Sequence, residues 1–407
     1  MADRKRRKRR SAPTLWRVFA GDAKNGEISL SFFAYVMILL VFGIIMMSSA
    51  SYAWAYSEHD GDGLFYAKSQ AKNALIGFAA MIFFAKMDYH NFKTLRLPLL
   101  KKFNIAGLLY VIGMIFLILA LAIGNDEGGQ MGAKRWLSIG PINFQPSEVA
   151  KLAIIVFFAY SMERDGKKMN LFKTGVVKYG VLVGVYIILL KMEPHLSGLI
   201  LVGCIAAVMI LCGGANIRQL ALLAVSGIIG AVLYISIQAQ NPESYISTRI
   251  KSWQDPFADV LNETWQTANS IIAIGSGGLF GLGLGNSRQK YLYLPETKND
   301  FVFPIVCEEL GFVGALAIIV VFFLLVVEGY SIAVRCKDRF GMLIAVGITT
   351  QIGIQTVLNL AVVSNLIPNT GISLPFFSYG GTALIMQMAE MGIMLNISQQ
   401  RYVKGRT

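Results

Sequence analysis

The sequence predicts an all-α polytopic membrane protein with about ten transmembrane helices. Of its 407 residues, 55% are hydrophobic and only 15% are charged, whereas soluble chains average about 45–50% apolar and about 25% charged residues. The apolar residues come in blocks of about 15–25, the length that an α-helix needs to cross the hydrocarbon core. These observations exclude a water-soluble enzyme, a secreted disulfide scaffold and a disordered protein. A β-barrel would need ten-residue alternating segments, which the sequence lacks.

Ten apolar segments are expected to span the membrane as one bundle. The bundle covers residues 30–397, between a basic tail at 1–29 and a short tail at 398–407. A long loop, residues 238–300, separates the seventh and eighth helices, and long loops in compact proteins are usually functional or disordered. The segments are 30–49, 73–86, 105–124, 149–162, 176–190, 198–212, 220–237, 302–327, 342–367 and 382–397.

The distribution of basic residues predicts the orientation. With a cytoplasmic N-terminus, the inner segments carry 25 of the 37 Lys and Arg residues, the outer segments carry 10, and two lie within helices. The positive-inside rule then places both termini in the cytoplasm and the 238–300 loop outside. The basic run from Arg4 to Arg10 is interpreted as an anchor to membrane lipids, not as a nucleic-acid site.

A first polar cluster precedes the fourth segment. Lys134, Arg135 and Trp136 would suit an anionic headgroup that carries sugars, although basic residues and Trp also anchor proteins at the interface. Glu148 and Lys151 are three residues apart, so they share one helix face and can form an ion pair at the membrane edge. Ionisable residues inside a membrane indicate function by default, and the alternative is a pair that only fixes helix packing.

A second carboxylate, Asp300, lies where the long loop meets the apolar segment 302–327. Partial desolvation there would raise the pKa of Asp300 and make it a better base. The alternative is that Asp300 caps the following helix. Lys298 and, more distantly, Arg288 and Lys290 are basic residues that could hold an anion near Asp300.

Three further segments are rich in polar residues or glycine. Glu193 and His195 lie in a short outer turn and raise the odds of a polar cavity, although a lone His is more often a hydrogen-bonded turn residue. The Gly-rich stretch 275–290 follows no strand, so its glycines are expected to permit tight turns, while residues 287–290 could meet a phosphate. The Pro- and Gly-rich stretch 364–382 is expected to be a re-entrant or capping loop.

Taken together, these motifs resemble the SEDS family (shape, elongation, division and sporulation), which includes FtsW, RodA and SpoVE. The matching stretches occur in the family's order over residues 132–385, and their wording is closer to FtsW and SpoVE than to RodA. They read GAKRWLSIGPINFQPSEVAKLAII, EPHLSG, W-Q-x-x-N-S (residues 265–270), GLGLGNSRQKYLYLPETKNDFVF, CEELGFVGA and NTGISLPFFSYGGTAL. Many members carry a His before the Asp of the fourth motif, where this chain has Thr297-Lys298-Asn299.

The resemblance implies a SEDS-type bundle and a peptidoglycan glycosyltransferase that polymerises lipid II in cell division or cell-shape maintenance. It assigns the general base to Asp300 and places Glu148 and Lys151 in the central cavity. A divalent cation, Mg²⁺ or Mn²⁺, could assist the pyrophosphate leaving group, although the sequence has no dedicated metal motif. The implied partners are a class B penicillin-binding protein, which is a transpeptidase, and other divisome or elongasome proteins.

The alternative function is a lipid II flippase, which needs access from both membrane faces. Mirrored, interrupted helix pairs would favour a transporter, and the sequence has no clear internal repeats. Either function needs a polar substrate site. Its candidate residues are Lys134, Arg135, Trp136, Gln145, Ser147, Glu148, Lys151, Glu193, His195, Gln266, Ser287, Gln289, Lys290, Glu296 and Ser378.

Overall fold

A computed structural model describes residues 27–95, 103–125, 135–139, 142–193, 196–240, 245–262 and 264–400. Most of both predicted tails, and the candidate residues Lys134 and His195, lie outside these ranges. Each of the ten predicted segments contains a helix. The ten helices are α2 (Leu30–Glu58), α3 (Phe65–Lys86), α4 (Ile105–Ile123), α5 (Pro146–Asp165), α6 (Lys178–Met192), α7 (Leu196–Cys212), α8 (Ile217–Ala239), α11 (Val302–Arg335), α12 (Arg339–Val363) and α13 (Gly381–Ser398).

The remaining elements are short. The long loop folds into two helices of its own, α9 (Tyr245–Gln254) and α10 (Trp265–Ser276). Two antiparallel hairpins flank α4 and involve two or three residues per strand. They are β1 (Thr94–Leu95) with β2 (Phe103–Asn104), and β3 (Leu137–Ile139) with β4 (Ile142–Phe144). The remaining short elements are the 3₁₀ helices η1 (Tyr89–Phe92) and η2 (Gly166–Asn170) and the π-helix η3 (Phe172–Val177).

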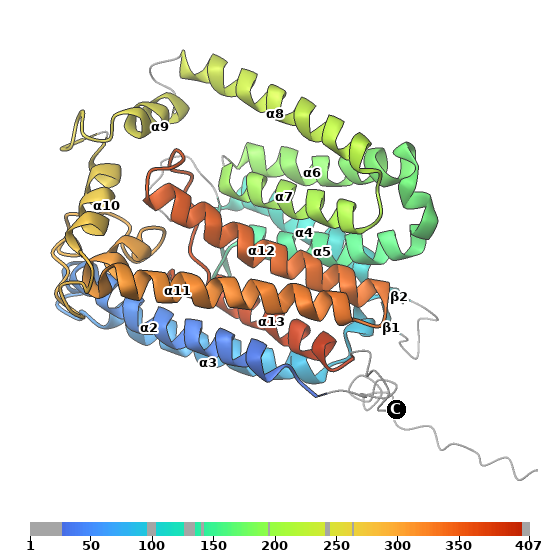
Figure 1. The fold of residues 1–407 in the computed structure, drawn as a ribbon, viewed down its shortest axis with the longest axis horizontal. Helices are drawn as coiled ribbons and strands as arrows, with labels where there is room; N and C mark the ends of the chain where they lie inside the picture. Colours follow the sequence, from blue (N-terminus) through green and yellow to red (C-terminus); the bar gives the residue numbers. More distant parts are fainter. Residues whose placement is uncertain are drawn as a thin grey trace, which may run out of the picture.

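The helices form a multi-span membrane bundle, as predicted. By length and apolar composition, five stretches of the described chain can cross a bilayer: α2, α4, η3 with α6, α11 and α12. The helices run side by side, with α9 and α10 at one end of the bundle and the β1–β2 hairpin at the other (Figure 1). Helix α8 lies along one edge, and none of its described side chains is buried.

The described chain begins and ends at the same end of the bundle. The backbone N–H of Ser29, just before α2, donates to the Ser398 hydroxyl at the end of α13 over 3.0 Å. This contact agrees with an even number of spans, which would place both termini on one side of the membrane.

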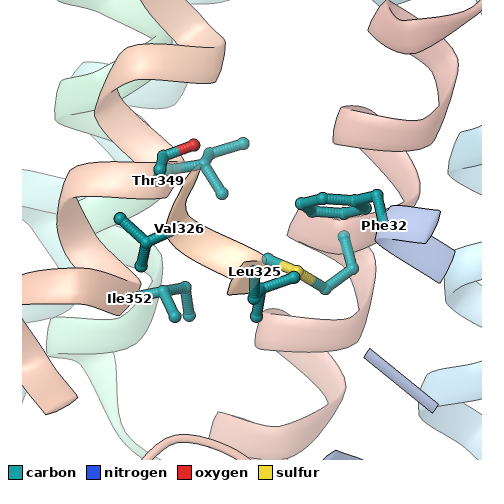
Figure 2. Close-up of a pocket in the computed structure, with 7 residues that line it drawn as sticks. Phe32, Leu325, Val326, Thr349 and Ile352 are labelled. Carbon is teal, nitrogen blue, oxygen red and sulfur yellow. The ribbon is translucent and has the colours of Figure 1, made fainter. Parts of the chain in front are cut away.

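In the described part of the chain, a small apolar gap lies between α2, α11, α12 and α13. Its volume is about 10 Å³, near the minimum that holds one water molecule. Figure 2 shows Phe32, Leu325 and Ile352 around it, with Thr349 at its edge. The Thr349 hydroxyl is buried and has no hydrogen-bond partner among the described residues.

Helix α11 contains the predicted spanning segment 302–327, and its backbone is interrupted at Gly311. Gly311 has φ 68° and ψ −172°, outside the helical region. The Gly-rich loop enters the break, where Leu282 N–H donates to the Glu308 carbonyl over 2.9 Å and Phe312 N–H to the Gly278 carbonyl over 2.9 Å. A Cβ on Gly281 would lie 2.2 Å from the Glu309 carbonyl oxygen, so only glycine fits there. The predicted tight turns of this stretch are thereby confirmed, and hydropathy could not reveal the break.

Candidate active site

Asp300 lies immediately before α11 without capping it. The N-cap residue of α11 is Phe301, and no side chain makes a capping hydrogen bond there. The capping alternative is therefore wrong. The Asp300 carbonyl instead accepts a hydrogen bond of 2.8 Å from Asn359 Nδ2 on α12, and the same nitrogen donates to the Ile372 carbonyl over 2.6 Å. This amide fixes the Asp300 backbone between α12 and the 364–380 loop.

The Asp300 carboxylate is available for chemistry. The side chain is partly exposed, and among the described residues no hydrogen-bond donor or ion-pair partner is assigned to its carboxylate. Burial raises the pKa of Asp300 to about 6 and the neighbouring charge of Glu296 adds to the rise, while Arg249 and Arg135 act in the opposite direction. A carboxylate with a pKa near 6 is both charged at neutral pH and basic enough to accept a proton.

Helices α9 and α10 hold the loop that faces Asp300. Arg249 Nη1 on α9 donates to the Asn369 carbonyl over 2.5 Å, and Asn369 Nδ2 donates to Gln266 Oε1 on α10 over 2.8 Å. Two residues further along, Gly371 packs against the Asp300 carboxylate. Gln266, a predicted site residue, therefore contacts the loop beside the carboxylate. Arg249 was not predicted, because no local pattern marks a single Arg fifty residues before the Asp.

The first two polar clusters meet near the same carboxylate. Arg135 Nε donates to the Glu193 carbonyl over 3.3 Å, and the Arg135 charge acts on both Glu193 and Asp300. Burial raises the pKa of Glu193 to about 8, and its Oε1 has no hydrogen-bond partner among the described residues. Trp136 is partly exposed and pairs through its backbone with Asn125. Arg135 thus links Glu193 to the surroundings of Asp300, although the three residues are far apart in sequence.

A second group of charges lies at the start of α5. The predicted ion pair is confirmed: Lys151 Nζ lies 2.8 Å from Glu148 Oε1, and the two side chains are 4% and 8% exposed. Glu390 on α13 lies within electrostatic range of both groups and accepts a hydrogen bond of 2.9 Å from Gln351 Nε2. The sequence offered a signal for Glu390, because it is the only charged residue in the 382–397 segment.

Two more predicted residues lie beside this pair. The Ser147 hydroxyl is buried and has no hydrogen-bond partner among the described residues. Gln145 precedes α5, and its backbone N–H donates to the Thr382 hydroxyl at the start of α13 over 3.4 Å. Gln145 therefore lies where α5 meets α13, and Ser147 follows two residues later in the first turn of α5.

Three residues that were predicted to contact a phosphate are instead bound to carboxylates of the chain. Lys290 Nζ lies 2.9 Å from Glu309 Oε1, with side-chain exposures of 4% and 0%. The Ser287 hydroxyl donates to the Glu308 carboxylate, and Lys298 Nζ pairs with Glu58 over 2.9 Å and contacts the Tyr66 hydroxyl. The lysines are thus compensated, and the positive charge that acts on Asp300 comes from Arg135 and Arg249.

The other predicted residues order the surrounding loops. Gln289 N–H donates to Glu308 Oε2 over 3.3 Å, and the buried Gln289 Oε1 has no partner among the described residues. The Ser378 hydroxyl accepts from the Leu374 N–H over 2.7 Å and so closes a turn. Glu296 adopts a positive φ of 55° and accepts from Asn299 Nδ2 over 2.6 Å.

No group of three or more His, Cys, Asp or Glu side chains in the described ranges is arranged to hold a metal ion. The chemistry available at the site is a carboxylate base beside two arginines.

The chain is similar in sequence to known bacterial proteins over most of its length. The family model of the FtsW, RodA and SpoVE cell cycle proteins matches residues 29–403. Stage V sporulation protein E of Bacillus subtilis (strain 168) is 39% identical over 365 residues, which cover 89% of this chain and 94% of the relative. A probable peptidoglycan glycosyltransferase FtsW of Geobacter sp. (strain M18) is 35% identical over 362 residues, again covering 89% and 94%.

Solved structures share the fold. A structure on the coordination of polymerization and crosslinking by a peptidoglycan synthase complex matches with a TM-score of 0.73 and 23% identity, covering 93% of this chain and 99% of that one. The crystal structure of the rod shape determining protein RodA of Thermus thermophilus matches with a TM-score of 0.64 and 23% identity, covering 92% and 98%.

Proposed function

Because the chain belongs to the family of FtsW, RodA and SpoVE cell cycle proteins, we propose that it is a peptidoglycan glycosyltransferase that polymerises lipid II. Relatives at 35% identity over nearly their whole length carry this activity in their names. The observation that carries the proposal for this chain is the Asp300 carboxylate, which no donor occupies among the described residues and whose pKa is raised to about 6.

In the proposed reaction, a sugar hydroxyl of the acceptor attacks the anomeric carbon of the donor. A new glycosidic C–O bond forms, and the bond between that carbon and the lipid pyrophosphate oxygen breaks. Asp300 accepts the hydroxyl proton as general base. The lipid pyrophosphate leaves with its electron pair, so negative charge grows on its bridging oxygen.

The arginines around Asp300 would stabilise this leaving group. Arg135 and Arg249 both lie close enough to lower the pKa of Asp300, and guanidinium groups bind phosphate oxygens in a bidentate manner. Fixed positive groups aimed at developing charge are usually the largest single contribution to catalysis. The Glu148, Lys151 and Glu390 group would line the deeper part of the substrate cavity.

The experiment that tests the assignment compares purified wild-type chain with the Asp300→Asn variant on lipid II. The Asn side chain keeps the size of Asp and loses its basicity, so polymer formation is expected to fall about 10²–10⁴-fold. The matched control is Asp62→Asn, which removes a carboxylate that pairs with exposed Lys68. Thermal unfolding of all three proteins checks that they fold.

Polymer formation by a folded Asp300→Asn protein at the wild-type rate would overturn the assignment and favour the flippase. An equal loss in the Asp62→Asn control would show that the decrease is not specific. Assays of wild type and Asp300→Asn with and without a class B penicillin-binding protein test the proposed transpeptidase partner. Of these two proteins, only the wild type should polymerise faster when the partner is present.

The proposal includes a bacterial plasma-membrane location with both termini in the cytoplasm and residues 238–300 outside. The excess of basic residues on the inner segments supports this orientation. In a background without the four natural cysteines, Ser276→Cys should react with an impermeant maleimide on intact cells, because Ser276 is exposed. A cysteine added at the C-terminus should not react; the reverse pattern would contradict the orientation.

A further inference from the structure

A polar hollow opens at the opposite end of α5 from the candidate active site. Its volume is about 440 Å³, within the range of about 300–1,000 Å³ that small-molecule sites occupy. Glu148 and Arg164 are separated by 16 residues of α5, which places the hollow about 24 Å from the ion pair. It is lined by Asn104, Phe157, Tyr160, Ser161, Arg164, Asp165, Lys168 and Lys178.

The lining changes from apolar to cationic along one face of α5. Phe157, Tyr160 and Arg164 follow one another at intervals of three and four residues, so they share a face of the helix. The two aromatic side chains are partly buried, whereas Arg164 is exposed at the helix end. An amphipathic molecule would find apolar contacts at one end of the hollow and positive charge at the other.

The positive charge in the hollow is only partly compensated. Asp165 is the one carboxylate of the lining, and it is engaged by Lys178 Nζ at 2.7 Å and by the Tyr179 hydroxyl at 2.8 Å. Within the described ranges, neither Arg164 nor Lys168 has a carboxylate within ion-pair distance. Two adjacent cations without a counter-charge, beside a hollow, are typical of an anion site.

We propose that this hollow binds the phosphate of an anionic phospholipid, with Arg164 and Lys168 on the phosphate and Phe157 and Tyr160 beside the glycerol and first acyl carbons. In the orientation proposed above, the hollow opens at the cytoplasmic leaflet, where anionic lipids concentrate and basic pockets between helices bind headgroups. The aromatic half of the lining favours a lipid over free phosphate, because a free anion gains nothing from it.

The test measures lipid retention by native mass spectrometry of the purified full chain in detergent, with phosphatidylglycerol and phosphatidylcholine supplied in equal amounts. Wild type should retain phosphatidylglycerol preferentially. The double variant Arg164→Gln/Lys168→Gln should weaken that retention about tenfold to thirtyfold, since each cation near the membrane surface contributes about fivefold. The matched control Lys167→Gln/Lys173→Gln also removes two exposed positive charges from this loop, but both lysines lie outside the lining, so retention should fall clearly less than in the first double variant.

Three outcomes would overturn the proposal. Equal retention of the two lipids by wild type would show no anion selectivity. Equal losses in Arg164→Gln/Lys168→Gln and in Lys167→Gln/Lys173→Gln would show that only the net charge of the loop matters. Complete release of phosphatidylglycerol by excess inorganic phosphate would make the hollow a site for a soluble anion. Both substituted side chains are exposed, so thermal unfolding of the double variant should match wild type.

Discussion

The backbone of Gly371 lies against the carboxylate of Asp300, so that a Cβ on Gly371 would sit 3.2 Å from Asp300 Oδ2. Gly371 also has a φ of 71°, which disfavours any side chain. The close approach leaves the carboxylate without a neighbouring side chain on this side. The loop that supplies Gly371 is itself held by Arg249 and Gln266 through Asn369.

The first prediction is that Gly371→Ala lowers polymerisation about tenfold to a hundredfold, because small displacements of a reacting group have effects of this size. The control is Gly285→Ala, at which φ is also positive, 83°, and nothing lies within 4 Å of the added Cβ. Both variants carry backbone strain, and only Gly371→Ala crowds Asp300. Initial rates with purified protein check the prediction, and equal losses in the two variants would contradict it.

The second prediction concerns the pH profile of the reaction. A base acts in its deprotonated form, so the polymerisation rate should fall as the pH drops through about 6, the pKa of Asp300. Glu296→Gln removes a charge that raises this pKa and should move the fall to lower pH. Arg249→Gln removes a charge that lowers the pKa and should move the fall to higher pH.

Rates measured from about pH 5 to pH 8 at saturating and limiting lipid II check these shifts. The opposite signs of the two shifts distinguish an effect on the pKa from general damage, which would lower both profiles without moving them. Shifts in the same direction would contradict the assignment of Asp300 as the titrating group.

The third prediction concerns Lys151, which lies between two carboxylates. Lys151→Met removes the cation that faces Glu148 and Glu390, and breaking a buried ion pair costs about 3–5 kcal/mol of unfolding free energy. The double variant Lys151→Met/Glu148→Gln should recover part of the loss, because the carboxylate that has lost its partner is then replaced by a neutral amide. Thermal unfolding in detergent checks both.

The control for Lys151 is Lys68→Met, which breaks an exposed pair with Asp62 and should cost about 0–1 kcal/mol. A Lys151→Met protein as stable as wild type would show that the buried charges are compensated by other means. No recovery in the double variant would show that an unpaired Glu148 carboxylate is not the cause of the loss.

The fourth prediction uses two adjacent threonines of α12. The Thr349 hydroxyl is buried beside the apolar gap without a partner among the described residues, whereas the Thr350 hydroxyl bonds the Tyr330 hydroxyl over 2.9 Å. Thr349→Val should stabilise the fold by about 1 kcal/mol, and Thr350→Val should destabilise it by about the same amount. Thermal unfolding separates the two, and destabilisation by Thr349→Val would contradict the prediction.

The sequence predicted the helical bundle because long apolar runs are sufficient to identify membrane helices. It also predicted the Glu148–Lys151 pair, since a spacing of three residues fixes a shared helix face. It did not predict that Lys290 faces Glu309 or that Lys298 faces Glu58, because no local spacing links these partners: Glu309 approaches Lys290 only through the fold of the Gly-rich loop, and Glu58 lies on α2, 240 residues before Lys298. Basic residues close to Asp300 in sequence were therefore not the ones whose charge acts on its carboxylate.

The break in α11 and the contact made by Arg249 show two further reasons why the sequence could not predict the whole site. Gly311 lies within an apolar run, and hydropathy does not report a backbone φ of 68°. Arg249 reaches the Asp300 region only because α9 folds back onto the 364–380 loop, which is a tertiary contact with no local signal.

The pairing of α3 with α13 has a consequence for synthesis of the chain. These two helices form the most extensive helix–helix contact of the bundle, and Gln70 and Asn396 tie them together through bonds to the Ser378 and Ala85 carbonyls. The ribosome must make residues 87–380 before α13 exists. Until then, the face of α3 that packs against α13 stays uncovered in the bilayer. A chain that stops before Gly381 should therefore be degraded by quality-control proteases of the membrane.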